Sequence, residues 1–142
     1  MEYKLVIGMK DGKSHQIEVK DDQAAALHNK HLGDTVKGDA LGFTGYEFLI
    51  TGGSDKAGFP MRKGIQAPRK RILIGKSVGF SGKNRNKKKQ NGLVKRRTVC
   101  GERVTKIIRQ VNLKVTKEGS APLVKAEETP AEPAAEEAKK EE

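Results

Sequence analysis

Residues 3–19, YKLVIGMKDGKSHQIEV, contain the pattern that decides the fold. Apolar and polar side chains alternate over residues 3–9, and a period of two is typical of a half-buried strand. Asp11-Gly12 follows, a dipeptide strongly favoured in two-residue hairpin turns. Ile17 and Val19 then alternate with polar residues on the return. The sequence therefore predicts an opening antiparallel hairpin.

Alternating segments farther along the chain predict more strands at residues 46–51, 71–74 and 111–116. Gly-rich stretches separate some of them, and residues 52–60 read as a loop by composition. The regular succession of strand and helix that a doubly wound sheet requires is absent. We therefore expect a mainly β (α+β) fold, with a small antiparallel β-barrel-like domain that carries a basic extension.

Helical patterns are confined to two short segments. Residues 23–27 are rich in alanine, follow Asp21 and Asp22, either of which can cap a helix, and precede Gly33, which can end one. Apolar residues with i, i+3, i+4, i+7 spacing at 104–111 predict one or two further helical turns.

Charge is divided unevenly along the chain. Residues 56–117 hold 20 of the 29 Lys and Arg residues and a single acid, Glu102, whereas both flanking segments are net acidic. Such a surplus repels itself in a compact state unless a polyanion neutralises it, and an ordinary solvated face mixes both signs. The pattern predicts phosphate binding. The residues expected to face RNA are Lys56, Arg62, Lys63, Arg69, Lys70, Arg71, Lys76, Lys83, Arg85, Lys87, Lys88, Lys89, Lys95, Arg96 and Arg97.

The small aromatic content indicates how nucleic acid would be recognised. The chain has four Phe, two Tyr and no Trp, and three of these rings lie at positions that read as buried strand. That is too few for a platform that stacks single-stranded bases. Folded RNA suits backbone recognition, because its shape, phosphates and 2′-hydroxyls can be read without unstacking bases. Lysines would act as point charges and arginines as bidentate forks.

The bulk features suggest one domain at residues 1–119 and a disordered acidic tail rich in Ala, Glu and Pro at residues 120–142. The one cysteine, Cys100, rules out an internal disulfide and indicates a reducing compartment. The apolar run near the N-terminus is too short for a signal peptide or a membrane helix. We expect a cytoplasmic protein with no membrane association.

No catalytic residue, metal site, cofactor or small-molecule substrate is expected. The Gly-rich segment 52–58 lacks the ending of a P-loop. His28 and His31 have a spacing that could share a metal, but structural zinc usually takes several cysteines, so surface histidines are favoured. Two alternatives stay open. A free RNA chaperone or nucleoid-type protein would contact nucleic acid broadly, and an RNA-modifying enzyme would need a catalytic constellation that the sequence does not show.

The stretch ITGGSDKAGFPMRKG at residues 50–64 closely resembles the ribosomal protein S-six-e family of the small subunit in archaea and eukaryotes. The resemblance includes KRRTVCG at 95–101 and VNLKV at 111–115, and it covers residues 1–119. It implies a β-barrel-like domain bound to small-subunit rRNA beside other ribosomal proteins, with basic extensions along the RNA. Residues that it favours as RNA-facing are Lys56, Arg62, Lys63, Lys95, Arg96 and Arg97.

The C-terminus departs from the eukaryotic members of that family. Those members continue into a long basic helix that ends in a phosphorylated serine cluster, whereas this chain ends in an acidic tail without such serines. Regulation by phosphorylation therefore does not carry over, and the short form resembles archaeal members.

Overall fold

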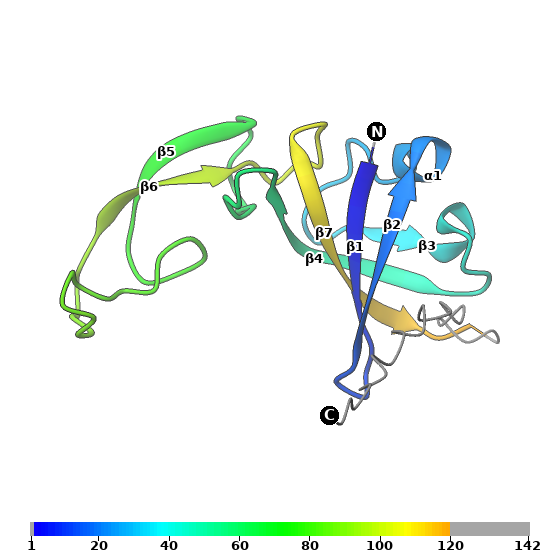
Figure 1. The fold of residues 1–142 in the computed structure, drawn as a ribbon, viewed down its shortest axis with the longest axis horizontal. Coiled ribbons are helices and arrows are strands. Elements are labelled where there is room, and N and C mark those ends of the chain that lie inside the picture. The colour runs from blue at the N-terminus through cyan, green and yellow to red at the C-terminus, as the bar shows by residue number, and fades with distance from the viewer. Residues whose placement is uncertain (1, 120–142) are drawn as a thin grey trace, which may run out of the picture.

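The strands of residues 2–119, the part of the chain that the computed structural model describes, form one curled sheet and one separate hairpin (Figure 1). The strands are β1 (Glu2–Gly8), β2 (Ser14–Lys20), β3 (Thr35–Lys37), β4 (Glu47–Asp55), β5 (Arg69–Ile74), β6 (Lys95–Cys100) and β7 (Ile108–Lys117), with helix α1 (Asp21–Ala25) and the short 3-10 helix η1 (Gly38–Leu41). The expected mainly β fold is confirmed. The predicted disorder of residues 120–142 falls outside the described residues.

The sheet is a half-barrel with strand order β2-β1-β7-β4-β3. Neighbouring strands are antiparallel, except that β1 and β7 are parallel. The predicted opening hairpin is confirmed, because Leu5 pairs with Ile17, Tyr3 pairs with Val19, and Gly12 takes a positive φ in the turn. β7 follows all the other strands in sequence but lies in the middle of the sheet, so it joins the opening hairpin to β4.

The core is formed by the inward face of the sheet and by residues that cover it. Tyr3, Tyr46 and Phe48, the three aromatic residues at predicted strand positions, are all buried. Tyr46 and Phe48 stack with ring centroids 5.8 Å apart. Leu27, just after α1, and Leu41, in η1, pack against this face. The two short helices therefore act as covers for a β core.

Gly53 allows β4 to lie close to β7 and to the segment after β4. The loop predicted at residues 52–60 is wrong for its first four residues, which belong to β4. A β carbon on Gly53 would lie 2.5 Å from the Gln110 carbonyl oxygen and 2.8 Å from the Met61 sulfur. Glycine within a strand often marks such close approach. The Gly-rich composition therefore reflects crowding between β4, β7 and the segment after β4.

The helical turns predicted at residues 104–111 are wrong. Residues 105–107 form a turn in which the Ile108 amide donates to the Thr105 carbonyl oxygen at 3.0 Å, and β7 begins at Ile108. Val104 and Ile108 enter the core, whereas Ile107 is 39% exposed. The apolar spacing at residues 104–111 thus arises from a turn followed by the start of a strand. Pairing of β7 with β4, which reaches Asp55, overrides the local pattern.

The first predicted helix is present, but its ends differ from the predicted ones. α1 spans Asp21–Ala25, and the helix ends well before Gly33, which takes a positive φ. The N-cap position belongs to Lys20 and has no side-chain capping hydrogen bond, so the predicted cap at Asp21 or Asp22 is wrong. Packing of Ala24 into the core holds this short helix in place of a cap.

Two strands have no counterpart among those predicted. β3 has only three residues and one inward side chain, Val36, which pairs with Phe48 of β4. β6 begins with Lys95, Arg96 and Arg97, so its apolar residues are too few to show alternation. Both strands depend on partners distant in sequence.

We predict different effects for two adjacent glycines of β4. Gly53→Ala should lower the free energy of unfolding by about 1–3 kcal/mol, because its β carbon would meet a backbone oxygen that cannot move freely. Gly52→Ala is the matched control, because its β carbon would lie 3.7 Å from the Asn112 side chain. Urea unfolding of both variants measures the difference. Equal effects would contradict the packing role given to Gly53.

Candidate nucleic-acid interface

The predicted RNA-facing residues lie mostly on a separate element, the β5–β6 hairpin and its connection. In Figure 1 this hairpin extends to the left of the sheet, away from α1, η1 and β3. β5 and β6 are antiparallel, with Arg71 opposite Thr98 and Ile74 opposite Lys95. A small hydrophobic cluster of Ile74, Phe80 and Val99 stabilises the hairpin. The basic extension is therefore built on its own two-stranded scaffold.

Residues 60–62 join the hairpin to the sheet through backbone hydrogen bonds. The Met61 amide donates to the Gly53 carbonyl oxygen of β4 at 2.9 Å. On the other side, the Cys100 amide donates to the Pro60 carbonyl oxygen at 2.9 Å, and the Arg62 amide donates to the Cys100 carbonyl oxygen at 3.0 Å. This short segment thus links β4 to the end of β6.

Asp55 adds a buried charge to the same junction. Asp55 is only 3% exposed. Its carboxylate accepts hydrogen bonds from the Phe59 amide at 2.8 Å, from the Cys100 thiol at 3.3 Å and from the Arg69 guanidinium. Burial alone would raise the pKa of Asp55, but these hydrogen bonds and the Arg69 charge hold that pKa below its ordinary value of 3.8. Asp55 therefore stays ionised and holds both hairpin strands.

Cys100 has a specific role at this junction. It is fully buried, and burial together with the hydrogen bond to Asp55 raises the pKa of its thiol to about 11. A thiol that stays protonated is a poor nucleophile. Cys100 therefore serves as a hydrogen-bond donor at the junction.

The fifteen predicted residues fall into three groups along the chain. All lie in residues 56–97, which contain no acid. Lys56, Arg62 and Lys63 are in the segment after β4. Arg69, Lys70 and Arg71 are in β5, and Lys95, Arg96 and Arg97 are in β6. The connection between these strands carries Lys76, Lys83, Arg85, Lys87, Lys88 and Lys89.

Most of these cations have no carboxylate partner among the residues that the structure describes. Within residues 2–119, Arg69 is the only one of them in an ion pair, with Asp55. Arg62 has a different internal role, because its guanidinium donates to the Ser77 hydroxyl at 2.6 Å and to the Val78 carbonyl oxygen at 3.0 Å. The side chains of Arg62 and Arg69 therefore stabilise the hairpin and its attachment to the sheet.

The run KNRNKKK at residues 83–89 forms a tight turn. Lys83 and Lys89 form an antiparallel bridge, the Asn84 amide donates to the Lys88 carbonyl oxygen at 2.8 Å, and Lys87 takes a positive φ. All seven residues are exposed. The turn brings five cations together on a short stretch of backbone, where they repel one another unless an anion is near.

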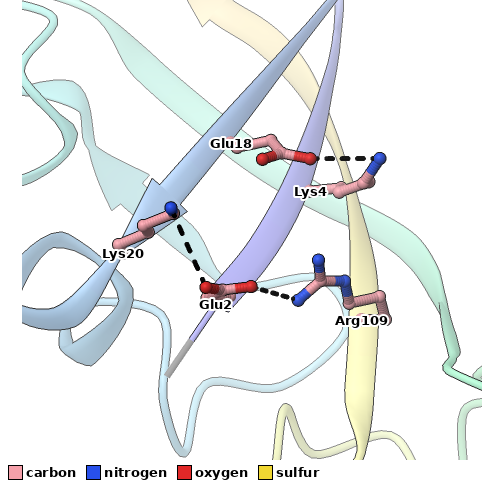
Figure 2. A network of polar contacts seen from close by, with 5 residues as sticks. All are labelled: Glu2, Lys4, Glu18, Lys20 and Arg109. Carbon is pink, nitrogen blue, oxygen red and sulfur yellow. Dashed lines mark hydrogen bonds and ion pairs between the residues drawn. The ribbon is translucent and has the colours of Figure 1, made fainter.

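On the face of β1 and β2 opposite the core, cations are paired with acids (Figure 2). Glu2 contacts Arg109 at 2.7 Å and Lys20 at 3.9 Å, and Lys4 contacts Glu18 at 3.1 Å. β7 belongs to the basic segment by sequence, yet its Arg109 is part of this network. In the described part of the chain, cations on the sheet are therefore largely matched by acids, whereas those on the hairpin are not.

The two histidines considered as metal ligands have separate partners. The Nδ1 atom of His28 lies 3.4 Å from the Tyr3 hydroxyl, and His31 lies 3.7 Å from Asp34. Between residues 2 and 119, the structure brings together no group of three potential ligands among His, Cys, Asp and Glu. In the same range, no helix is long and apolar enough to cross a bilayer.

The hairpin also forms a hollow that the sequence did not reveal. Its lining includes Phe59, Pro60, Arg71, Arg96 and Thr98. Arg97 also lines the hollow. The three arginines were predicted, but Phe59, Pro60 and Thr98 were not. Their position depends on β6, which was not expected, and on the turn that brings residues 58–60 against the hairpin. No local sequence signal could have placed Thr98 opposite Arg71.

The fold and the site define a half-barrel β protein with a projecting hairpin whose cations are largely without acidic partners. The family model described as "Ribosomal protein S6e" matches residues 3–128. The protein therefore belongs to the ribosomal protein S6e family, as its sequence motifs indicated.

Curated relatives named "Small ribosomal subunit protein eS6" are similar over most of their length. The relative from Methanoculleus marisnigri is 35% identical over 86% of this chain and 89% of its own. A relative from Methanococcus maripaludis is 38% identical, covering 87% of this chain and 94% of its own. The relative from Thermoplasma acidophilum is 34% identical over 84% and 91%. The expected resemblance to archaeal members is confirmed.

We predict that Asp55→Asn lowers the free energy of unfolding by about 1–3 kcal/mol at neutral pH, because an amide nitrogen would face the Cys100 and Arg69 donors. The folded-state pKa of Asp55 lies below 3.8, so the stabilisation is complete above that pH and is lost as the pH falls through the folded-state value. The gap between wild type and variant should therefore narrow in acid.

Urea unfolding at neutral pH and in acid measures this gap. Glu18→Gln is the control, since it removes an exposed ion pair with Lys4 and should change stability little. A gap that is the same at every pH would contradict an ionised Asp55 as the source of the stabilisation.

Proposed function

We propose that this protein is a structural component of the small ribosomal subunit, and that residues 56–97 bind and stabilise rRNA through contacts with its phosphate backbone. One observation carries the proposal: fifteen cations lie on a projecting hairpin and its attachment, in a stretch without acids, and only Arg69 has an ion-pair partner among residues 2–119. The relatives named as small-subunit proteins support the assignment to the ribosome.

The half-barrel serves as the rigid anchor of this contact. Its core is continuous, and the charges on the outer face of β1 and β2 are neutralised within the sheet (Figure 2). The hairpin carries the excess charge outward, where phosphates can replace the missing acids and release their counterions. Within domain 1–119, the neutral sheet thus serves as a scaffold and the cationic hairpin contacts the rRNA. The protein would act in the cytoplasm, beside other ribosomal proteins.

Structured RNA fits this arrangement better than single strands. Of the six aromatic residues, Tyr3, Tyr46, Phe48 and Phe80 are buried, so they offer no stacking platform to unpaired bases. The exposed groups on the hairpin are mainly ammonium and guanidinium groups, which recognise phosphate position and helix shape. No catalytic role is needed for such a contact.

Sedimentation of native extracts tests the assignment to the ribosome. On a sucrose gradient at moderate salt, the protein should sediment with small subunits. If it stays at the top of the gradient, the assignment fails. If it instead crosslinks to many cellular RNAs away from ribosomes, a free RNA chaperone is the better description.

We predict that replacing Lys87, Lys88 and Lys89 with Gln lowers the slope of log affinity against log salt by about 2 units for small-subunit rRNA. These side chains are exposed and outside both hydrophobic clusters, so the melting temperature of the free protein should barely change. Filter binding over a salt series and thermal unfolding measure the two effects.

A second triple variant controls for charge alone. Replacing Lys4, Lys10 and Lys20 with Gln removes the same charge, but each of these lysines contacts a carboxylate, from Glu18, Glu118 and Glu2 respectively. This variant should keep a salt slope close to that of the wild type. Equal slopes for the two triple variants would contradict a specific role for the turn at residues 83–89.

A further inference from the structure

The hollow on the hairpin combines cationic and apolar lining residues. It lies where the turn after β4 meets the β5–β6 hairpin and has a volume of about 420 Å³. Its lining includes three arginines and Thr98 together with Phe59 and Pro60. A recess with cationic and apolar walls differs from the exposed turn at residues 83–89, which offers only a convex charged surface.

Three arginines line this hollow, and two of them, Arg71 and Arg96, have side chains that are free to bind, whereas the Arg97 guanidinium lies over the Phe80 ring. Arg71 is opposite Thr98 in the strand pairing, and Arg96 lies two residues before Thr98, so all three side chains belong to the same face of the hairpin. Neither the Arg71 nor the Arg96 side chain forms an ion pair or hydrogen bond with another residue between 2 and 119. Arg69, which precedes them on this face, is already bound to Asp55.

Lysines and arginines are distributed unequally between the two faces of the hairpin. Every cation of β5 and β6 on the face of the hollow is an arginine. Lys70, Lys95 and Arg97 belong to the opposite face, where Lys95 lies 6.0 Å and Arg97 5.6 Å from the centre of the Phe80 ring. Arginine is the residue that grips phosphate bidentately, whereas lysine acts as a point charge. The face of the hollow therefore has the chemistry of directed phosphate recognition.

The other walls suit a nucleotide. Phe59 and Pro60 offer apolar surface, and the Arg69 guanidinium lies 5.2 Å from the centre of the Phe59 ring and fixes its position. Gly79, which also lines the hollow, takes a positive φ, and a β carbon there would lie 3.0 Å from the Val99 side chain. Because Gly79 has no side chain, this wall does not project into the hollow. The Thr98 hydroxyl can donate to a phosphate oxygen or a ribose hydroxyl.

We infer that this hollow holds one backbone phosphodiester of RNA, gripped by Arg71 and Arg96, with the attached ribose against Phe59 and Pro60. Affinity at this point is set by guanidinium geometry, whereas the turn at residues 83–89 contributes through charge. The inference rests on the proposed function, because it assumes that the hairpin contacts rRNA. It adds a specific anchoring point to a contact that is otherwise diffuse.

Charge-conserving substitutions separate geometry from charge. Arg71→Lys and Arg96→Lys, alone and together, keep the net charge but lose the planar fork. The probe is small-subunit rRNA from the source organism, measured by filter binding over a salt series. The double variant should bind about tenfold more weakly than wild type or worse, with an unchanged salt slope. Both residues are exposed, so the melting temperature of the free protein should stay the same.

Arg109→Lys is the matched control, because Arg109 is a guanidinium outside the hollow that pairs with Glu2 on the sheet. It should bind rRNA as the wild type does. If the double variant also binds as the wild type does at every salt concentration, the hollow is not a phosphodiester site, and the proposed function stands without it. If the wild-type protein does not bind the rRNA at all, the proposed function fails and the inference fails with it.

Discussion

The buried carboxylate of Asp55 is the interaction on which the relation between the two parts of the molecule depends. It ends β4 of the half-barrel and binds a side chain from each strand of the hairpin, Arg69 of β5 and Cys100 of β6. Backbone hydrogen bonds through Met61 support the same junction. A strongly cationic hairpin attached only by flexible chain would move freely. Held by this junction, it presents its charges in a fixed direction relative to the core.

The same junction explains why one chain can carry such different surfaces. On the sheet, cross-strand pairs such as Lys4 and Glu18 neutralise each other, and the core below them resembles that of an ordinary β protein. On the hairpin, repulsion among cations opposes compactness, and the small cluster around Phe80 offsets it only in part. The sheet thus provides stability and the hairpin provides the binding surface, and Asp55 connects the two.

Much of the half-barrel could be predicted from the sequence, because the alternation in β1 and the Asp11-Gly12 turn are local signals. The errors have physical causes. Gly53 was placed in a loop because composition does not show that a β carbon would strike β7. β6 was missed because three consecutive cations conceal its alternation. Asp55 and its partner Cys100 are 45 residues apart, so only the fold shows that the acid is buried. The cations themselves were identified, but their sorting between the hollow and the turn requires the strand register.

The central claim is that rRNA lies against the hairpin and not against the neutralised face of the sheet. Ultraviolet crosslinking of assembled small subunits, followed by mass spectrometry of RNA-bound peptides, tests it most directly. Crosslinked peptides of this protein should come from residues 56–97, with few or none from β1 and β2. Crosslinks confined to β1 and β2, with none in residues 56–97, would contradict the account.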